Sequence, residues 1–332
     1  MSAWDEMLDE FRALGGTANN IRLGQGEFGR GLFPIDPAKP VTIHVPENLL
    51  IGVKNVVFAD GKLRVGPNAK VSDRERAWLD RYQEDYGWGG GGGDEVRQTV
   101  EMAAALPADL RRLLITKYHL APWFQDATEE LVRNRFFNAR TITYLDQSVL
   151  IPVLELTNHG PGDGFDVSKG VALRGTFPGE IYAQYAEFDS FDFFRSWGFA
   201  TQRPLAFSMA LTGNIQSTRL EIEQSFPGMT SSPRDWIPRI GKTAGAITLP
   251  FLMIGNKKFP RLSKGIFYRL MRDAGYTGFE EAFDLVQHTN RLHFLDLIAA
   301  ADGIDLPMAR TVRTMAQFQL RAMSYCFGVR EI

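Results

Sequence analysis

The sequence contains a single cysteine, Cys326. One thiol excludes a disulfide within the chain, and it also excludes a zinc site built from several cysteines. A chain with so little cysteine suits a reducing compartment, where thiols stay unpaired. This absence therefore predicts a cytoplasmic protein.

Long apolar runs are also missing. The best candidate, 246–255, has about half of the roughly 20 residues that a membrane-spanning helix needs, and it contains Pro250. The first eleven residues are acidic and amphipathic, which is unlike a secretory signal peptide. We therefore expect no membrane-spanning segment in this sequence.

Neither sign of charge dominates the chain. There are 37 Lys and Arg against 39 Asp and Glu, the net charge is -2, and no long run carries one sign. Nucleic acids and anionic membranes recruit proteins through clustered basic side chains. The sequence therefore predicts neither nucleic acid nor membrane as a partner, and any basic substrate groove has to be local.

Apolar residues make up 44% of the 332 positions, enough for one large domain or two ordinary ones. Short apolar stretches predict strands at 41–45, 49–53, 56–59 and 62–65. Asp60-Gly61 between the last two is a two-residue hairpin signal. Ser72 with Glu75 forms a capping box that opens a helical insertion, about residues 71–138. Helices are predicted again at 262–274, 278–301 and 307–327, so the class is α+β.

Two glycine-rich stretches resemble phosphate-binding loops but stand in the wrong context. Gly24, Gly26 and Gly29 match the spacing of a dinucleotide-binding turn, which has to open a helix. Prolines follow at 34, 37 and 40, so the pattern predicts strand, turn and strand, with backbone that can approach a ligand closely. The five glycines at 89–93 lack the Gly-Lys-Ser/Thr ending and are predicted to form a flexible connector.

A buried strand is predicted at 149–156, and a polar pair follows it. Asn158 and His159 would lie beside the core, where each side chain needs a partner or a ligand. A ligand site and a satisfied turn at a strand end both explain the pair. Tyr185 likewise is either a functional group or a half-buried aromatic of an alternating strand over 180–185.

Glu155 and His159 stand four residues apart, a spacing that would suit a metal pair on a helix. The local pattern is that of a strand, no third ligand is in register, and the chain has five histidines in all. We therefore predict no metal site.

These stretches together resemble a known family. Arg140-Thr141 at a strand start, LIPVLELTNH at 150–159, GEIYAQY at 179–185 and WGF at 197–199 follow the order found in SET-domain methyltransferases. The most similar subgroup is typified by the Rubisco large-subunit and actin-histidine methyltransferases. Gly29-Arg30-Gly31-Leu32-Phe33, followed by HVPENLLI at 44–51, resembles the first motif of that family. The resemblance covers about residues 23–53 and 138–211.

The resemblance implies a SET-like fold over residues 1–211 and a mainly helical domain over 212–332. It also implies S-adenosylmethionine as cofactor and a protein or peptide as substrate. Tyr185 matches the tyrosine whose hydroxyl borders the methyl group and the target amine, and Trp197 and Phe199 match the substrate channel. The matched cofactor-binding positions are Phe28, Gly29, Arg30, Gly31, Arg140, Asn158 and His159.

The implied activity is methylation of a protein side chain, lysine in the first place and histidine in the second. Two departures weigh against it. Trp197 stands where the subgroup has a tyrosine, and Glu155 with the loop 160–162 replaces an Asp with a small polar flank. A catalytically silent SET-like binding module therefore stays open as the alternative, with a nucleotide-dependent oxidoreductase a distant third. The target protein, the number of methyl groups added and the oligomeric state stay open too.

Overall fold

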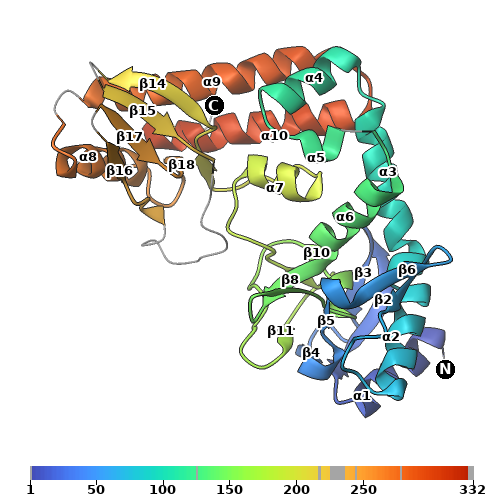
Figure 1. Cartoon of the computed structure of the whole chain (residues 1–332). Coiled ribbons are helices and arrows are strands. Elements are labelled where there is room, and N and C mark those ends of the chain that lie inside the picture. The colour runs from blue at the N-terminus through green and yellow to red at the C-terminus, as the bar shows by residue number, and fades with distance from the viewer. Residues whose placement is uncertain are drawn as a thin grey trace. The chain divides into compact units, whose positions relative to one another are not determined.

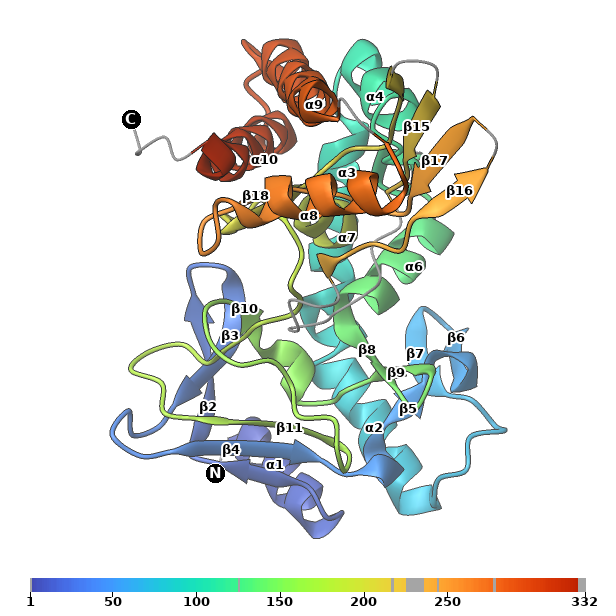
Figure 2. The ribbon, with the colours of Figure 1, turned by 90° about the vertical axis from the view of Figure 1, so that its left-hand side faces the viewer.

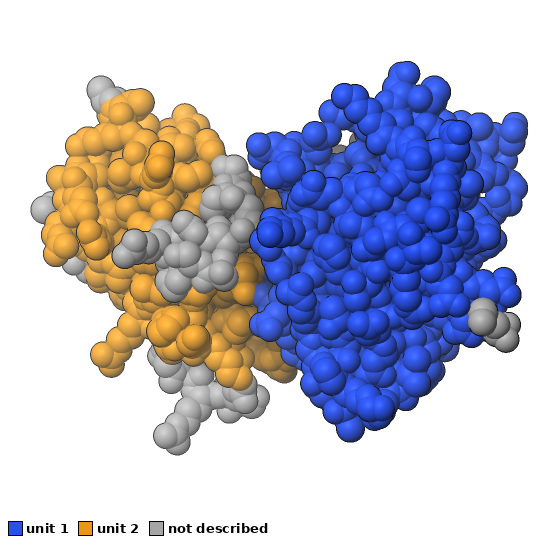
Figure 3. Space-filling model, turned by 90° about the horizontal axis from the view of Figure 1, so that it is seen from below, with its two compact units in different colours: residues 1–98, 127–186 blue, residues 99–126, 187–332 orange. Residues whose placement is uncertain are grey.

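The structure is a computed structural model that describes residues 2–124, 126–215, 218–224, 236–243, 245–276 and 279–327. The chain divides into two compact units, shown in different colours in Figure 3. Unit 1 comprises residues 1–98 and 127–186, and unit 2 comprises 99–126 and 187–332. The division thus falls after Ala186 instead of near residue 211, and of the expected insertion only 99–126 belongs to unit 2.

Unit 1 combines short strands with α-helices (Figure 1). Its helices are α1 (Ala3–Ala13), α2 (Asp73–Asp85), the first half of α3 (Gly93–Ala104) and α6 (Glu129–Arg140). Its strands are β1 (Thr17–Asn19), β2 (Ile21–Gly26), β3 (Gly29–Pro34), β4 (Val41–Val45), β5 (Ile51–Gly52), β6 (Val56–Ala59), β7 (Lys62–Val65), β8 (Thr141–Tyr144), β9 (Gln147–Leu150), β10 (Asn158–His159), β11 (Val171–Gly175) and β12 (Tyr182–Ala183).

The strands of unit 1 pair in small groups rather than in one large sheet. The groups are β1–β4–β11, β5–β9–β8, β2–β3, β6–β7 and β10–β12. Among the described residues of unit 1, every pair is antiparallel except β10 with β12. Figure 2 shows the long β2–β3 hairpin and the β4–β11 pair of this unit. The predicted α+β class with short, mostly antiparallel strands is confirmed.

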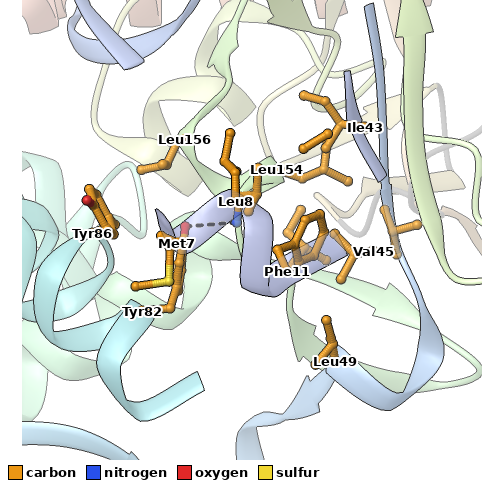
Figure 4. Close-up of a cluster of buried hydrophobic side chains, with 14 of the residues drawn as sticks. Met7, Leu8, Phe11, Ile43, Val45, Leu49, Tyr82, Tyr86, Leu154 and Leu156 are labelled. Atoms are coloured by element: carbon orange, nitrogen blue, oxygen red, sulfur yellow. Dashed lines mark hydrogen bonds between the residues drawn. The ribbon is translucent and has the colours of Figure 1, made fainter. Parts of the chain in front are cut away.

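The core of unit 1 forms where α1, β4, α2 and the turn after β9 meet (Figure 4). Burial explains why α1 forms, because its four large apolar side chains lie on one face at helical spacing. The buried side chains that Figure 4 labels are Met7, Leu8, Phe11, Ile43, Val45, Leu49, Tyr82, Tyr86, Leu154 and Leu156. This cluster holds the turn after β9 in place.

Several local predictions are confirmed in unit 1. The stretch with GxGxxG spacing forms the β2–β3 hairpin, with Gly26 opposite Gly29. Asp60 and Gly61 both have positive φ, +51° and +74°, as the turn of a two-residue hairpin requires. The Ser72–Glu75 capping box is formed at the start of α2.

Other local predictions are wrong. The strand expected at 149–156 ends at Leu150, and a 3₁₀ turn follows at Leu154–Leu156. Arg140 is the last residue of α6 instead of the first of a strand. The glycines at 89–93 lie in a tight π-helical turn (Trp88–Gly92) that leads into α3, and a Cβ at Gly90 would lie 2.2 Å from the Asp85 carbonyl oxygen. This segment is packed, so it is no open connector.

The backbone after β9 contains a strained γ-turn. Val153 has φ +69° and ψ -53°, and the Leu154 N–H donates to the Pro152 carbonyl oxygen at 2.9 Å. A β-branched residue adopts this rare geometry at a cost of about 1–3 kcal/mol, so the surrounding contacts have to hold it. One such contact comes from α2, because the Tyr82 hydroxyl accepts the Val153 N–H at 2.9 Å.

Unit 2 combines a small sheet with helices (Figure 1). Its strands are β13 (Leu205–Phe207), β14 (Leu211–Ile215), β15 (Thr218–Ile222), β16 (Gly241–Thr243), β17 (Ala246–Leu249) and β18 (Met253–Asn256), paired as β14–β15–β17–β16 and β13–β18. Its helices are the second half of α3, α4 (Ala108–Thr116), α5 (Ala121–Phe124), α7 (Ser190–Trp197), α8 (Leu262–Asp273), α9 (Glu280–Ala301) and α10 (Pro307–Ser324). The three helices expected after residue 261 are confirmed, although Gly278, the predicted start of the second, lies outside the described residues.

A buried carboxylate joins three elements of unit 2. Asp189 caps α7 by accepting the Asp192 N–H at 2.8 Å, and its other oxygen accepts the Phe207 N–H and the Gln319 side-chain amide. These bonds tie α7 to β13 and α10. None of the helices in the described ranges has both the length and the apolar content that crossing a membrane needs.

We predict that Tyr82→Phe lowers the free energy of unfolding of the protein by about 1–3 kcal/mol. The substitution keeps the buried ring but leaves the Val153 N–H without a partner, and a buried unpaired donor costs about that much. Chemical denaturation would measure the change.

Tyr86→Phe is the matched control, because Tyr86 follows the same helix and its hydroxyl makes no hydrogen bond to any described residue. It should change the free energy of unfolding by less than about 0.5 kcal/mol. If the two variants lose the same free energy of unfolding, the Tyr82 hydroxyl does not stabilise the γ-turn.

Candidate functional site

Asn158 joins three distant parts of unit 1. Its Nδ2 donates to Glu180 Oε1 at 2.6 Å and to the Arg30 carbonyl oxygen at 3.3 Å. β10 and β12 place these groups, because Asn158 is paired with Tyr182 and the Ile181 N–H donates to the Leu32 carbonyl of β3 at 2.8 Å. The first motif, the Asn-His pair and the GEIYAQY segment therefore meet at one amide.

The glycines of the β2–β3 hairpin leave room for the Glu180 carboxylate. A Cβ at Gly26 would lie 2.1 Å from Glu180 Oε2, and a Cβ at Gly31 would lie 2.2 Å from Oε1 and 3.0 Å from Asn158 Nδ2. At those distances a side chain at either position would displace the end of the Glu180 side chain, so the two glycines leave room for the carboxylate where it lies. The group that lies against this turn is a carboxylate of the chain itself. The close approach of a ligand to the turn stays a prediction.

Tyr185 contacts the Asn-His segment through both backbone and side chain. Its hydroxyl donates to the Thr157 carbonyl oxygen at 2.6 Å, and its backbone N–H donates to His159 Nδ1 at 3.3 Å. Burial raises the pKa of Tyr185 to about 12, with Glu180 adding to the rise and Arg140 opposing it. The phenol is therefore neutral at physiological pH, and its oxygen keeps lone pairs that can accept a hydrogen bond.

Packing accounts for part of the placement of Tyr185. Its ring lies against the core of unit 1, next to the His159 ring at a centroid distance of 5.3 Å. The strand predicted over 180–185 contains only Tyr182–Ala183, so Tyr185 lies beyond its end. A position after a strand end suits a group that has to face a ligand.

Glu155 is buried, and the half-buried Arg140 lies beside it. Arg140 donates to the Glu155 carbonyl oxygen at 2.8 Å and to Glu95 Oε2 at 2.7 Å. Gln83 donates to Glu155 Oε1 at 3.3 Å. Burial raises the pKa of Glu155 to about 7, although the charges of Arg140 and Arg30 oppose the rise.

Two polar atoms of this cluster are buried and have no hydrogen-bond partner among the described residues. They are Arg30 Nη2, a donor, and Glu155 Oε2, an acceptor, although the Tyr82 hydroxyl lies near enough to the Glu155 carboxyl to oppose the rise of its pKa. The other terminal nitrogen of Arg30 donates to the Gly90 carbonyl, so the packed glycine turn orients the guanidinium. Buried atoms of this kind need a partner, and a ligand carrying both donors and acceptors would satisfy them.

The structure brings together five of the seven predicted cofactor residues, namely Arg30, Gly31, Arg140, Asn158 and His159, with the catalytic candidate Tyr185. Phe28 lies at the tip of the β2–β3 hairpin and is 61% exposed. A Cβ at Gly29 would meet no atom within 4 Å, so Gly29 is needed only for its φ of +92°. Neither residue contributes to the contacts around Asn158, and their role in cofactor binding stays a prediction.

The two predicted channel residues belong to unit 2, whereas Tyr185 belongs to unit 1. Trp197 ends α7 and packs in an aromatic cluster with Phe188, Phe193 and Phe199, at 4.9 Å from the Phe193 ring. The channel assignment of Trp197 and Phe199 stays a prediction.

Sequence reasoning missed Glu180, Gln83 and Tyr82 as parts of the site. The glycine-glutamate pair at 179–180 was a usable signal, since a charged residue before a buried strand needs a partner. For Gln83 and Tyr82 no signal pointed beyond the helical pattern. In the described ranges, no three His, Cys, Asp or Glu side chains gather as metal ligands would.

We predict that Glu155→Gln stabilises the folded protein at pH 8 but not at pH 4. The folded-state pKa of about 7 lies above the usual value of 4.5, so between these values the folded state binds more protons than the unfolded state. The contribution of the Glu155 carboxyl to the free energy of unfolding therefore falls as the pH rises from 4.5 to 7, by about 3 kcal/mol at most. Denaturation curves at both pH values would measure the gain.

Asp192 of unit 2 also has its pKa raised to about 7, by burial and by the charge of Asp189. It contributes equally to both proteins, so the difference between wild type and Glu155→Gln isolates Glu155. A gain of the same size at pH 4 and pH 8 would contradict the buried charge as its cause.

Neither a protein-family model nor a curated protein matches the sequence. Among solved structures, Rubisco LSMT bound to AdoMet aligns with 99% of this chain and 91% of its own, at 15% identity and a TM-score of 0.43. The SET domain of LSMT bound to lysine and AdoHcy covers 98% and 90%, at 13% identity and a TM-score of 0.41. Rubisco LSMT bound to sinefungin and monomethyllysine covers 99% and 91%, at 15% identity and 0.41. These similarities are distant.

Proposed function

We propose that this chain binds S-adenosylmethionine and transfers its methyl group to a protein side chain, lysine in the first place and histidine in the second. One observation carries the proposal. Three segments that match the family motifs in sequence meet at the Asn158 amide, although they lie up to about 150 residues apart. Packing of a core requires no such convergence of polar groups.

The residues of unit 1 fit a ligand of this kind. S-adenosylmethionine carries an amino-acid end with an ammonium and a carboxylate, and its sulfonium supplies a methyl group to a neutral nucleophile. The buried donor of Arg30 suits an anionic or acceptor group, and the buried acceptor of Glu155 suits a hydroxyl or N–H donor. Gly31 keeps the hairpin backbone free of a side chain beside Asn158.

Tyr185 is assigned to the reacting end. A lysine amine has to be neutral to attack, whereas free lysine is protonated at pH 7, with a pKa of about 10.4. A neutral phenol whose hydrogen is held by the Thr157 carbonyl presents its oxygen as an acceptor. That oxygen can orient an amine N–H without taking a proton, which positions the nitrogen for transfer.

A catalytically silent binding module is the second candidate, and one observation favours it. The Tyr185 hydroxyl is already bonded to a backbone carbonyl at 2.6 Å, and Trp197 offers no second hydroxyl. A protein of this kind would bind the cofactor or a peptide without transfer.

The experiment that separates the two combines binding with transfer. Purified protein is titrated with S-adenosylmethionine by calorimetry and then incubated with lysate proteins and cofactor bearing an isotope-labelled methyl group. Digestion and mass spectrometry should find labelled methyl-lysine, and Asn158→Ala, which removes the central amide, should give neither binding nor label. Binding without label supports a silent module that holds the cofactor. Absence of S-adenosylmethionine binding contradicts the methyltransferase and leaves only a module that binds a peptide.

We predict that Tyr185→Phe leaves the Kd for S-adenosylmethionine within about twofold of wild type and lowers the transfer rate about 100- to 1,000-fold. The lost oxygen acts at the reacting centre rather than in ground-state binding, and one such oriented group is typically worth about 2.7–4 kcal/mol. Single-turnover kinetics would measure the rate. If the variant transfers the methyl group as fast as wild type, Tyr185 has only a packing role.

We also predict that Trp197→Tyr changes the acceptor or the number of methyl groups added more than it changes cofactor affinity. An indole holds a cation or imidazole by its face, worth about 0.5–2 kcal/mol, whereas a phenol also hydrogen-bonds an amine. Intact-mass analysis of the methylated product, with both proteins side by side, would measure the change. Loss of cofactor binding in the variant would place Trp197 in the cofactor pocket instead.

A further inference from the structure

Glu180 is a buried carboxylate without a cationic partner. It is 8% exposed, and none of the ion pairs between described residues includes it. Its only side-chain hydrogen bonds in the described part of the chain come from Asn158 at 2.6 Å and from the Tyr182 hydroxyl at 3.2 Å. A buried charge whose solvation is replaced by two neutral donors is destabilising unless a cation joins it.

Several features of unit 1 hold the Glu180 carboxylate in place. Gly26 and Gly31 lack the side chains that would expel it, and the hydrogen bond from Ile181 N–H to the β3 carbonyl of Leu32 fixes the adjacent backbone. Burial raises the pKa of the Tyr182 phenol, and the negative charge of Glu180 adds to the rise. Tyr182 is therefore a neutral donor to the carboxylate, and the charge is left uncompensated.

The acceptors around Glu180 match an ammonium group. Glu180 Oε1 and the Arg30 carbonyl oxygen are acceptors that lie beside the same nitrogen, Asn158 Nδ2, and Glu180 Oε2 belongs to the same carboxylate. An ammonium has three N–H donors and no acceptor, so neighbouring acceptor oxygens suit it, whereas a sulfonium has no N–H to donate. Charge-assisted bonds of this type are roughly twice as strong as neutral ones.

We propose that Glu180 binds the α-ammonium group of the cofactor and is a specificity-determining residue of this site. The inference rests on the proposed function, because the ligand is the one assigned there. When the ligand binds, the buried charge of Glu180 changes from unpaired to paired. The unpaired charge then lowers the stability of the ligand-free protein, and binding of the ligand raises it again.

Glu180→Gln tests the proposal, because glutamine keeps the shape and an acceptor for Asn158 but removes the charge. Binding of S-adenosylmethionine, measured by calorimetry, should weaken about 10- to 100-fold. The melting temperature of the ligand-free protein should rise by about 2–4 °C. A purely structural Glu180 would give the opposite change, a lower melting temperature.

Three further measurements sharpen the assignment. S-adenosylhomocysteine keeps the ammonium but lacks the sulfonium charge, so the variant should lose the same factor for it as for S-adenosylmethionine. Methylthioadenosine lacks the amino-acid end and should bind wild type and variant equally. Tyr182→Phe is the matched control, since it removes a hydrogen bond to the same carboxylate but keeps the charge, and its cofactor affinity should stay within about threefold of wild type.

The outcomes separate this inference from the proposed function. If wild type does not bind S-adenosylmethionine, the proposed function is wrong. If wild type binds and Glu180→Gln binds equally well, the function stands and the role of Glu180 is wrong. If Glu180→Gln loses affinity for S-adenosylmethionine but not for S-adenosylhomocysteine, the carboxylate contacts the sulfonium instead of the ammonium. If Tyr182→Phe loses as much cofactor affinity as Glu180→Gln, the hydrogen bonds of the carboxylate are the cause and its charge is not.

Discussion

The hydrogen bonds of the Asn158 amide are the interaction on which the site depends. One NH₂ group donates both to Glu180 and to the Arg30 carbonyl, and thereby fixes the β2–β3 hairpin against the β10–β12 pair. Each of these elements is too short to be stable by itself. The apolar core of unit 1 brings the hairpin and the β10–β12 pair near one another, and the hydrogen bonds of Asn158 then set the distance between them.

The position of Asn158 depends in turn on the turn that precedes it. Val153 adopts a strained conformation, Tyr82 satisfies its N–H, and the following residues bury Glu155 beneath Arg140. A regular strand would have sent the side chains of 154–158 alternately to opposite faces. The 3₁₀ turn instead puts Leu154 and Leu156 into the core while it leaves Asn158 at the edge. Strain, buried charge and unpaired polar atoms therefore occur together, as is common where a protein binds a ligand.

The sequence allowed the elements with strong local signals to be predicted. The capping box at Ser72, the hairpin at Asp60-Gly61 and the apolar stripe of α1 each depend on neighbours within a few residues. The glycine pattern was interpreted correctly as strand, turn and strand, because the prolines after it leave no helix. The order of the family motifs also pointed to residues that do lie together, Arg30, Gly31, Asn158 and Tyr185 among them.

What the sequence did not reveal depends on long-range contacts. An apolar run such as 149–156 is typical of a strand, and the contacts that hold the turn at Val153 include the Tyr82 hydroxyl, 71 residues away. The glycines at 89–93 looked unconstrained because the sequence pattern does not show that they pack against the end of α2 and against Arg30. Glu180 gave a weak signal for the same reason, since its burial follows from two glycines about 150 residues earlier.

The central claim is that the polar cluster around Asn158 receives the amino-acid end of S-adenosylmethionine. A crystal structure of the protein grown with S-adenosylhomocysteine tests it most directly. The account predicts ligand density between the β2–β3 hairpin and β10, with the ammonium group within hydrogen-bond distance of Glu180 and of Asn158. Ligand bound elsewhere, or bound with its ammonium group away from Glu180 and Asn158, would contradict it.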